Sequence, residues 1–198
     1  MDSKTKALNN ALAHNLGNTL TPELAVGILQ SYLNAEEEDL GFVPGNFQPL
    51  QVGDYVVRVE RFRDCVEEAS ILHRQFWVES GQTDPFNPDY AQICKLERLG
   101  MYVYFTARLG DDLVGQLAAY VQTCPHTGRL MARDNLLYVL PAHRVGVGKA
   151  LIAYGVDVVT SVGVTQIECH TAPDNRVQAM IKRLGFKHTA NRYIFKEE

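Results

Sequence analysis

Residues 136–152 read LLYVLPAHRVGVGKALI and form the most informative segment of this 198-residue chain. An apolar strand runs into a proline, then into a short basic and glycine-rich loop, and then into an amphipathic helix. Backbone N–H groups at the start of such a helix point outward and, with the helix dipole, make an anion site. Gly146 and Gly148 keep side chains out of the way of a phosphate group, and Arg144 and Lys149 supply positive charge beside it.

Two common phosphate-binding motifs do not fit the same residues. A Walker A loop needs a glycine where His143 stands and a serine or threonine where Ala150 stands. The dinucleotide fingerprint GxGxxG needs its third glycine at the position of Leu151. A nucleotide-phosphate-binding protein is therefore disfavoured, and two glycines that serve only a tight strand-to-helix turn are the structural alternative.

The segments around this turn predict a mixed sheet with helices on both faces, in the α/β (α+β) class. Alternating apolar runs predict strands, and apolar stripes at helical spacing predict helices. Residues 109–112 join two strand-like runs and indicate a hairpin. Early antiparallel strands followed by helix-linked strands give such a mixed sheet. The predicted order is strand 55–60, helices 63–79 and 87–99, strands 102–108, 113–122 and 135–140, helix 145–162, strand 165–170, helix 174–184 and strand 193–196.

Residues 1–50 are predicted to form a helical N-terminal extension and linker, and residues 51–198 the main domain. Thr21 and Pro22 are a good N-cap and first-turn pair for a helix in this extension. The acidic run 36–39 is interpreted as a solvated turn. We expect the extension to pack on the main domain or on a partner subunit. The apolar stripe of its helix is Leu24, Ile28, Leu29, Tyr32 and Leu33.

The composition is that of a soluble globular protein, with 46% hydrophobic and 21% charged residues. A net charge of −4 and a pI of about 5.9 give no basic field, so no nucleic-acid partner is expected. The four cysteines are scattered, which indicates reduced thiols, and Cys124 and His126 have no second pair at metal-ligand spacing. No secretory signal or membrane span is predicted, so the expected location is cytoplasmic.

The glycine-rich turn resembles the acetyl-CoA site of the GCN5-related N-acetyltransferase (GNAT) family. That family's motif is an apolar-x-apolar triplet at the end of a strand, a proline two residues later, and Arg/Gln-x-x-Gly-x-Gly/Ala opening a helix. The basic position falls on His143 by strict spacing, or on Arg144 if the loop is one residue shorter. The residues that match the triplet, the proline and the glycine pair are Leu137-Tyr138-Val139, Pro141 and Gly146-Val147-Gly148.

The C-terminal residues resemble the same family in kind. Its Asn-x-x-Ala…LGF ending is matched by Asp174-Asn175, Ala179 and Arg183-Leu184-Gly185-Phe186, with the alanine one position later than in the pattern. The resemblance covers about residues 55–198 and includes the order of the elements. The run 134–144 further resembles the acetyltransferase-like proteins of tailed phages.

The resemblance implies a GNAT-like acyl-CoA N-acyltransferase fold in which the fourth and fifth strands splay apart. Backbone groups at the splay then pair with the pantetheine arm, and the pyrophosphate binds the glycine-rich turn. The implied activity is that of a transferase, an acetyl-CoA-dependent N-acetyltransferase that acts on a primary amine by direct transfer in a ternary complex, with no metal. The implied cofactor-binding residues are Leu137, Tyr138, Val139, Arg144, Val145, Gly146, Val147, Gly148, Lys149 and Asn175.

Transfer to an amine requires a base that removes a proton from the nitrogen, directly or through water. The candidates are Asp134 at the start of the fourth strand and Glu168 and His170 on the fifth. Glu168 and His170 are two residues apart and are therefore expected on one face of the sheet. For each candidate, the alternative is a polar residue at a strand end that only faces water or makes a structural hydrogen bond.

The usual tyrosine acid of the family, five residues before the phenylalanine of LGF, is replaced here by Ile181. Tyr138 and Tyr193 are alternative acids, with packing in the core or at the rim as the other interpretation. Cys169 is interpreted as a small apolar residue and not as a covalent nucleophile. The replacement keeps a second function open, namely a catalytically weak acyl-CoA-binding module that acts through its N-terminal extension. Binding without turnover of any amine would favour that module.

The sequence leaves the acceptor amine open among a small molecule, a protein N-terminus, a lysine and a modified nucleobase. The acidic pI favours a cationic small acceptor over nucleic acid. Phe76 and Trp77 lie where the resemblance places the acceptor pocket, and core packing is their other interpretation. Whether the extension makes a homodimer is also left open.

Overall fold

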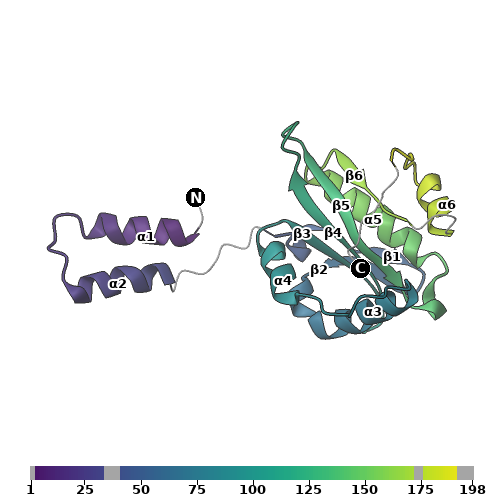
Figure 1. Cartoon of the computed structure of the whole chain (residues 1–198), viewed down its shortest axis with the longest axis horizontal. Helices are drawn as coiled ribbons and strands as arrows, with labels where there is room; N and C mark the ends of the chain where they lie inside the picture. Colours follow the sequence, from purple (N-terminus) through teal and green to yellow (C-terminus); the bar gives the residue numbers. More distant parts are fainter. Residues whose placement is uncertain (1–2, 34–40, 172–175, 191–198) are drawn as a thin grey trace.

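The computed structural model describes residues 3–33, 41–171 and 176–190 (Figure 1). Within these residues a six-stranded sheet has the order β1-β2-β3-β4-β5-β6, so neighbours along the chain are neighbours in the sheet. Every pair is antiparallel except β5 and β6, which are parallel. The predicted mixed α/β sheet is therefore confirmed. The strands are β1 (Leu50–Val52), β2 (Tyr55–Glu60), β3 (Tyr102–Leu109), β4 (Asp112–Thr123), β5 (Leu130–Val139) and β6 (Gln166–Glu168).

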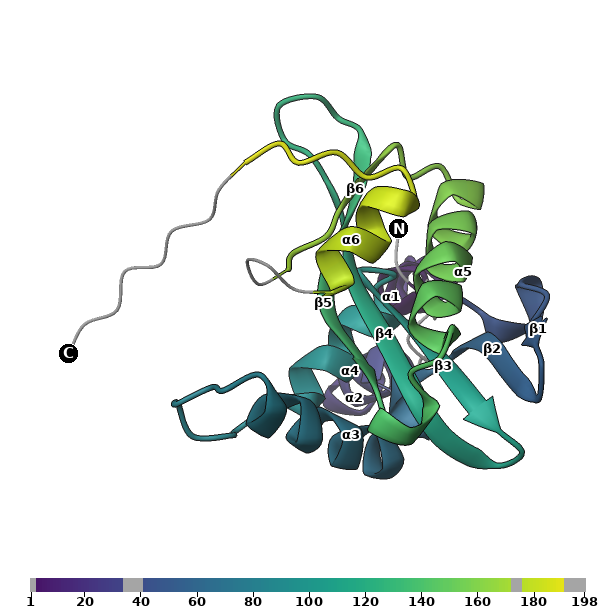
Figure 2. The ribbon, with the colours of Figure 1, turned by 90° about the vertical axis from the view of Figure 1, so that its right-hand side faces the viewer.

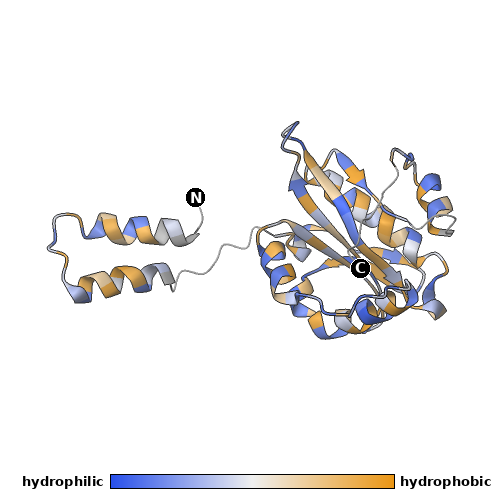
Figure 3. Ribbon diagram, in the orientation of Figure 1, coloured by the Kyte–Doolittle hydropathy of each residue, from blue (hydrophilic) through white to orange (hydrophobic). Residues whose placement is uncertain are grey.

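Helices cover both faces of this sheet (Figure 2). Residues of α3 pack into the core on one face, with α4 against it, and α5 packs on the other. Hydrophobic and hydrophilic residues are mixed along α3 and α5 (Figure 3), as expected of helices that face a sheet on one side. The helices are α1 (Ser3–His14), α2 (Pro22–Leu33), α3 (Val66–Glu79), α4 (Tyr90–Arg98), α5 (Val147–Ser161) and α6 (Arg176–Arg183), with 3-10 turns η1 (Pro44–Asn46), η2 (Phe62–Asp64) and η3 (Pro141–His143).

Two apolar cores lie on the two faces of the sheet. Because side chains alternate along a strand, Tyr102 and Tyr104 of β3 face α3 and α4, whereas Val103 and Phe105 face α5. All four side chains are at most 1% exposed. A strand that is buried on both faces reads as a continuous apolar run, which is the pattern seen in residues 102–105.

Several element boundaries differ from the predictions for local reasons. Helix α4 begins at Tyr90 and not at residue 87, because the Asp89 side chain accepts a hydrogen bond from Gln92 N at 2.9 Å and caps the helix there. Helix α5 begins at Val147 because Gly146 adopts a left-handed conformation with φ of 85°. Strand β5 begins five residues early, at Leu130, where it pairs with Thr123.

The N-terminal extension contains the predicted helix. Thr21 Oγ1 accepts a hydrogen bond from Leu24 N at 3.2 Å, as expected of an N-cap, and α2 packs against α1. Of its apolar stripe, Ile28 is buried, whereas Leu29 is 57% exposed. The acidic run 36–39 and the predicted strand 193–196 lie outside the described residues, and the division at residue 50 stays a prediction.

Candidate active site at the splayed edge of the sheet

Strands β5 and β6 separate after a ladder of three residue pairs. The pairs join residues 131–133 of β5 to residues 166–168 of β6, whereas β5 continues to Val139 along β4. The β4–β5 register shifts between Ala118 and Ala119, so that Asn135 is an extra residue, a β-bulge, at the point of separation. One edge of β5 from residue 136 onward is therefore unpaired within the part of the chain that the structure describes.

Two residues of β5 direct their backbone groups toward this open edge. Leu140 N donates to Val114 O at 2.9 Å across the β4–β5 ladder. Because backbone polar groups alternate in direction along a strand, the N–H and C=O groups of Leu137 and Val139 face away from β4. These groups can accept an extended ligand that lies along the edge as an added strand would.

The glycine-rich turn lies at the far end of this open edge. The first N–H groups of a helix lack intrahelical partners, so those of Val147, Gly148 and Lys149 are available to an anion. Gly146 is required by its positive φ. Gly148 is not, and a Cβ built on it would meet nothing closer than Val139 Cγ2 at 3.9 Å. Neither backbone strain nor packing therefore explains Gly148, whereas close approach of a ligand would.

Arg144, and not His143, is the basic residue at the open edge. Its Nε donates to Val139 O at 2.9 Å and its Nη2 donates to Glu79 Oε2 at 2.6 Å. The Tyr138 hydroxyl donates to the same oxygen at 3.1 Å. The hydrogen bond from Arg144 is the main cause that lowers the pKa of Glu79. His143 instead faces β2, where its Nδ1 lies 3.1 Å from the hydroxyl of Tyr55.

Asp134 and His170 meet across the gap where the strands separate. His170 Nδ1 lies 2.6 Å from Asp134 Oδ1, and His170 N donates to Asp134 Oδ2 at 3.0 Å. The Asp134 side chain is 16% exposed and that of His170 is 39% exposed. With Nδ1 held by the carboxylate, the imidazole presents Nε2 as its free nitrogen, the arrangement in which a histidine acts as a base.

The third candidate base, Glu168, has hydrogen-bond partners other than this pair. It accepts from Arg133 Nε at 2.8 Å and from Gln166 Nε2 at 3.0 Å. The prediction that Glu168 and His170 share a face of one strand is wrong, because β6 ends at Glu168 and the chain then turns toward Asp134.

Cys169 and the candidate acids are also placed by the structure. Burial, and next the Asp134 carboxylate, raise the pKa of the Cys169 thiol to about 12, so that it is not ionised at neutral pH. Ile181 is buried, 8% exposed. Burial, and next the hydrogen bond to Glu79, raise the pKa of Tyr138. Asn175 and Tyr193 lie outside the described residues.

An aromatic cluster joins α3 to residues 80–90 beside the splay. Phe76 packs edge-on against Tyr138 with ring centroids 6.3 Å apart. Trp77 contacts Phe86 and donates its Nε1 hydrogen to Asp84 O at 2.9 Å. A groove of about 480 Å³ opens between α3 and residues 86–90. Neither Phe76 nor Trp77 lines this groove, so their place in an acceptor pocket stays a prediction. Sequence reasoning missed Glu79, because nothing distinguishes this glutamate from others at helix ends.

Two kinds of feature are absent from the part of the chain that the structure describes. No helix in residues 3–33, 41–171 or 176–190 is long and apolar enough to cross a membrane. In the same ranges, no three or more His, Cys, Asp or Glu side chains gather in a way that could hold a metal ion.

The fold of this chain is similar to that of several solved structures. The chain resembles the structure of an aminoglycoside acetyltransferase from an uncultured soil metagenomic sample in complex with sisomicin, with 19% identity, a TM-score of 0.61, and coverage of 73% of this chain and 97% of that one. A ribosomal-protein-alanine N-acetyltransferase from Brucella melitensis biovar Abortus 2308 has 19% identity and a TM-score of 0.61, with coverage of 73% of this chain and 98% of that one. AAC(6')-Iy in complex with the bisubstrate analog CoA-S-monomethyl-acetylneamine has 21% identity and a TM-score of 0.55, with coverage of 73% of this chain and 98% of that one.

At these identities the structural likeness establishes the fold, and the family rests on the sequence itself. A search of the curated proteins found no match. The family model described as "Acetyltransferase (GNAT) family" matches residues 66–186, which hold α3 to α6, the glycine-rich turn and the Asp134–His170 pair. The chain therefore belongs to the GNAT family of acetyltransferases.

Proposed function

We propose that this protein transfers an acetyl group from acetyl-CoA to a primary amine in one step, within a ternary complex. The observation that carries the proposal is the splayed edge of β5, which has an anion-binding turn at one end and the Asp134–His170 pair at the other. An acyl thioester on a long phosphate-bearing arm fits this arrangement. A likeness in fold to AAC(6')-Iy, whose structure holds a CoA-based bisubstrate analog, supports the same choice.

The turn and the open edge divide the binding of acetyl-CoA between them. The diphosphate would receive the N–H groups of residues 147–149 and the charge of Lys149. The pantetheine amides would pair with the backbone of Leu137 and Val139. Because Arg144 Nε already occupies the Val139 carbonyl, cofactor binding is expected to displace this side chain from the edge. Arg144 would then be free to move toward the diphosphate. From the family resemblance, Asn175 is proposed as a further contact.

His170 acts as the base in this proposal, and Asp134 positions it. The amine nitrogen attacks the thioester carbonyl carbon and gives its proton to His170 Nε2, directly or through a water. The carbonyl oxygen becomes negative in the tetrahedral intermediate, where a backbone N–H of the open edge can stabilise it. The C–S bond then breaks, the amide forms, and the CoA thiolate takes a proton from water while the imidazolium returns its proton to water.

A covalent acyl-cysteine intermediate is not part of the proposal. Cys169 is the cysteine beside the Asp134–His170 pair, and its thiol, with a pKa of about 12, holds almost no thiolate at neutral pH. Direct attack by the amine is favoured by positioning alone, since both reactants are held in one cleft. Steady-state kinetics should therefore give intersecting double-reciprocal lines and not the parallel lines of a two-step exchange.

The acceptor is proposed to be a cationic small amine. Glu79 lies at the cleft, and it would lose its partner if Arg144 moved to the diphosphate, leaving a carboxylate beside Tyr138 and Phe76. The acidic chain favours the same class of acceptor. Aminoglycosides, the ligands named for two of the structural relatives, are polyamines of this class.

One residue favours a second function. Ile181 stands at the position of the usual tyrosine acid, so a weakly catalytic acyl-CoA-binding module is the alternative. A panel of amines, including aminoglycosides and N-terminal alanine peptides, distinguishes the two by release of the free CoA thiol. Release that depends on both substrates supports the transferase. Tight binding of acetyl-CoA without release by any amine supports the module.

A further inference from the structure

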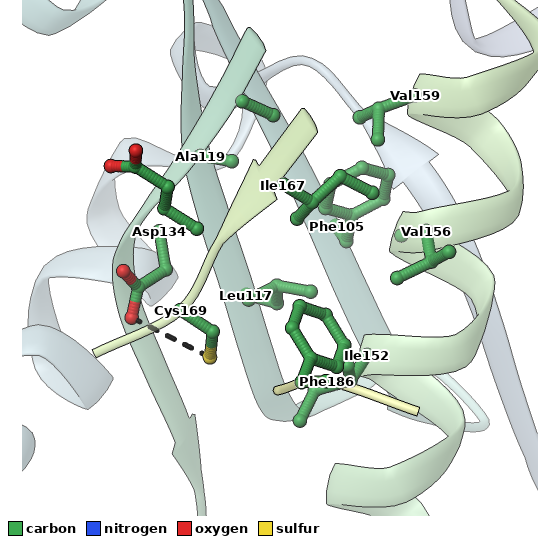
Figure 4. Close-up of a pocket in the computed structure, with 13 residues that line it drawn as sticks. Phe105, Leu117, Ala119, Asp134, Ile152, Val156, Val159, Ile167, Cys169 and Phe186 are labelled. Carbon is green, nitrogen blue, oxygen red and sulfur yellow. Dashed lines mark hydrogen bonds between the residues drawn. The ribbon is translucent and has the colours of Figure 1, made fainter. Parts of the chain in front are cut away.

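A small apolar cavity lies between the sheet and α5, where β5 and β6 separate (Figure 4). Its volume is about 40 Å³. Asp134 and Cys169 line it and directly follow the last β5–β6 residue pair, so the cavity begins at the vertex of the splay. Figure 4 shows the hydrogen-bonded Asp134 and Cys169 on one side and the α5 side chains Ile152 and Val156 on the other.

Small residues on three elements create this space. Ala119 of β4, Ala132 of β5 and Gly155 of α5 all line the cavity, and each is at most 9% exposed. A Cβ added at Gly155 would lie 2.9 Å from Leu117 Cδ2, so the glycine allows α5 to approach the sheet closely. Protein interiors are normally packed without voids larger than a water molecule. An apolar cavity beside the proposed reaction centre can therefore receive an apolar part of a ligand.

The position of the cavity selects the acyl end of the thioester as that occupant. With the diphosphate on the turn at the start of α5, the pantetheine arm runs along β5 toward the bulge at Asn135 and brings the thioester to the vertex. The aromatic cluster and Glu79 lie on the face of α3, so an amine that they hold approaches from that side. The acyl chain then points away from the amine, toward α5.

We propose that this cavity binds the acyl chain, and that the protein accepts propionyl and butyryl groups in preference to acetyl. The inference rests on the proposed function, and it extends the donor from acetyl-CoA to CoA thioesters with a slightly longer acyl chain. A space of about 40 Å³ can hold roughly three waters, which corresponds to about one or two methylene groups beyond acetyl. The surface of the cavity is almost wholly apolar, so an anionic acyl group such as succinyl is excluded.

Calorimetric titration with a series of CoA thioesters tests the pocket without knowledge of the acceptor. Each methylene buried in the cavity is expected to tighten binding about four-fold, so that affinity rises from acetyl-CoA to propionyl-CoA and butyryl-CoA. Octanoyl-CoA exceeds the cavity and succinyl-CoA carries a charge, so both should bind more weakly than butyryl-CoA.

Matched variants locate the effect in the cavity. Val156→Ala enlarges the cavity and should move the optimum toward a longer chain. Ala119→Val fills it and should remove the preference for butyryl over acetyl. Val158→Ala, on the same helix but outside the lining, removes the same groups from a buried site and should leave the order of affinities unchanged.

Two results would overturn the inference, and they differ in what else they reject. If propionyl-CoA and butyryl-CoA bind no tighter than acetyl-CoA, or if Val156→Ala and Val158→Ala shift the order alike, the acyl pocket is rejected and the transferase stands. If no CoA thioester binds to the folded protein, the pocket and the proposed function are rejected together. Val156 is only partly buried, so Val156→Ala is expected to fold. It can still be compared with Val158→Ala if Ala119→Val does not fold.

Discussion

Replacing Asp134 by asparagine should separate acetyl-CoA binding from catalysis. The carboxylate of Asp134 makes two hydrogen bonds to His170, one to Nδ1 at a distance of 2.6 Å and one to the backbone N at 3.0 Å. An asparagine keeps the shape but has one acceptor oxygen and one NH₂ group. If the oxygen keeps the backbone N–H, the NH₂ group faces Nδ1, which must then be an acceptor. The ring proton consequently moves to Nε2, and the base is lost.

The expected size of the effect follows from this change of tautomer. General-base catalysis contributes about 10²- to 10⁴-fold, so kcat for Asp134→Asn should fall by a factor in this range. His170→Ala should fall to a similar level, and the double variant should fall little further, because the two residues act as a unit. The dissociation constant of acetyl-CoA should stay within about two-fold in all three, since the contacts proposed for the diphosphate and the pantetheine arm, at the turn and the open edge, involve neither Asp134 nor His170.

The assay is release of the CoA thiol with the best amine found in the panel, beside calorimetry for the cofactor. Glu168→Gln is the matched control, because this carboxylate lies nearby but binds Arg133. It should retain kcat within about three-fold. His170 is not the base if His170→Ala retains nearly full kcat, and the pair has no special role if Glu168→Gln loses as much activity as Asp134→Asn.

Three further predictions concern other parts of the chain. Hydrogen bonding, first to the Thr127 side chain, lowers the pKa of the Cys124 thiol, whereas that of Cys169 is raised to about 12. Iodoacetamide at pH 7.5 should therefore label Cys124 first, and mass spectrometry should find labelling of Cys169 only as the pH rises far above neutral. Glu97, 5% exposed, accepts from two backbone N–H groups of the η2 turn; Glu97→Ala should cost about 1–3 kcal/mol in urea unfolding. Glu79→Gln removes the ion pair between Glu79 and Arg144, whose side chains are 46% and 45% exposed. Because Arg144 is then easier to displace, acetyl-CoA should bind up to about five-fold tighter by calorimetry. Weaker binding would show that Glu79 instead holds Arg144 where it contacts acetyl-CoA.

The fold and the glycine-rich turn could be predicted from the sequence because their signals are local. The apolar strand, Gly146, Gly148 and the amphipathic helix lie within one short segment, and each reports its own backbone geometry. The first residues of α4 and α5 were harder to predict from the sequence, because each depends on the conformation of one residue. These are the helix cap Asp89 and the left-handed Gly146. The likeness to acetyltransferase-like proteins of tailed phages stays a prediction.

The candidate site could be predicted only as a set of unconnected residues. Asp134 and His170 are 36 positions apart in the sequence. Their pairing requires that β6 end at Glu168, and no sequence pattern predicts that end. Glu79 is one of many exposed glutamates until the fold brings it to Arg144. The cavity beside Asp134 likewise exists only where small residues of different elements meet.

The most direct test of the central claim is calorimetric titration of acetyl-CoA into the native protein and into Gly148→Glu. The variant places a carboxylate where the diphosphate should bind, and Gly148 has no backbone or packing constraint that the change would violate. Gly27→Glu is the matched control, because Gly27 lies on α2 with nothing within 4 Å of a built Cβ. We expect micromolar binding by the native protein and by Gly27→Glu, and loss of binding in Gly148→Glu. Absence of binding by the folded native protein, or equal binding by all three, would contradict it.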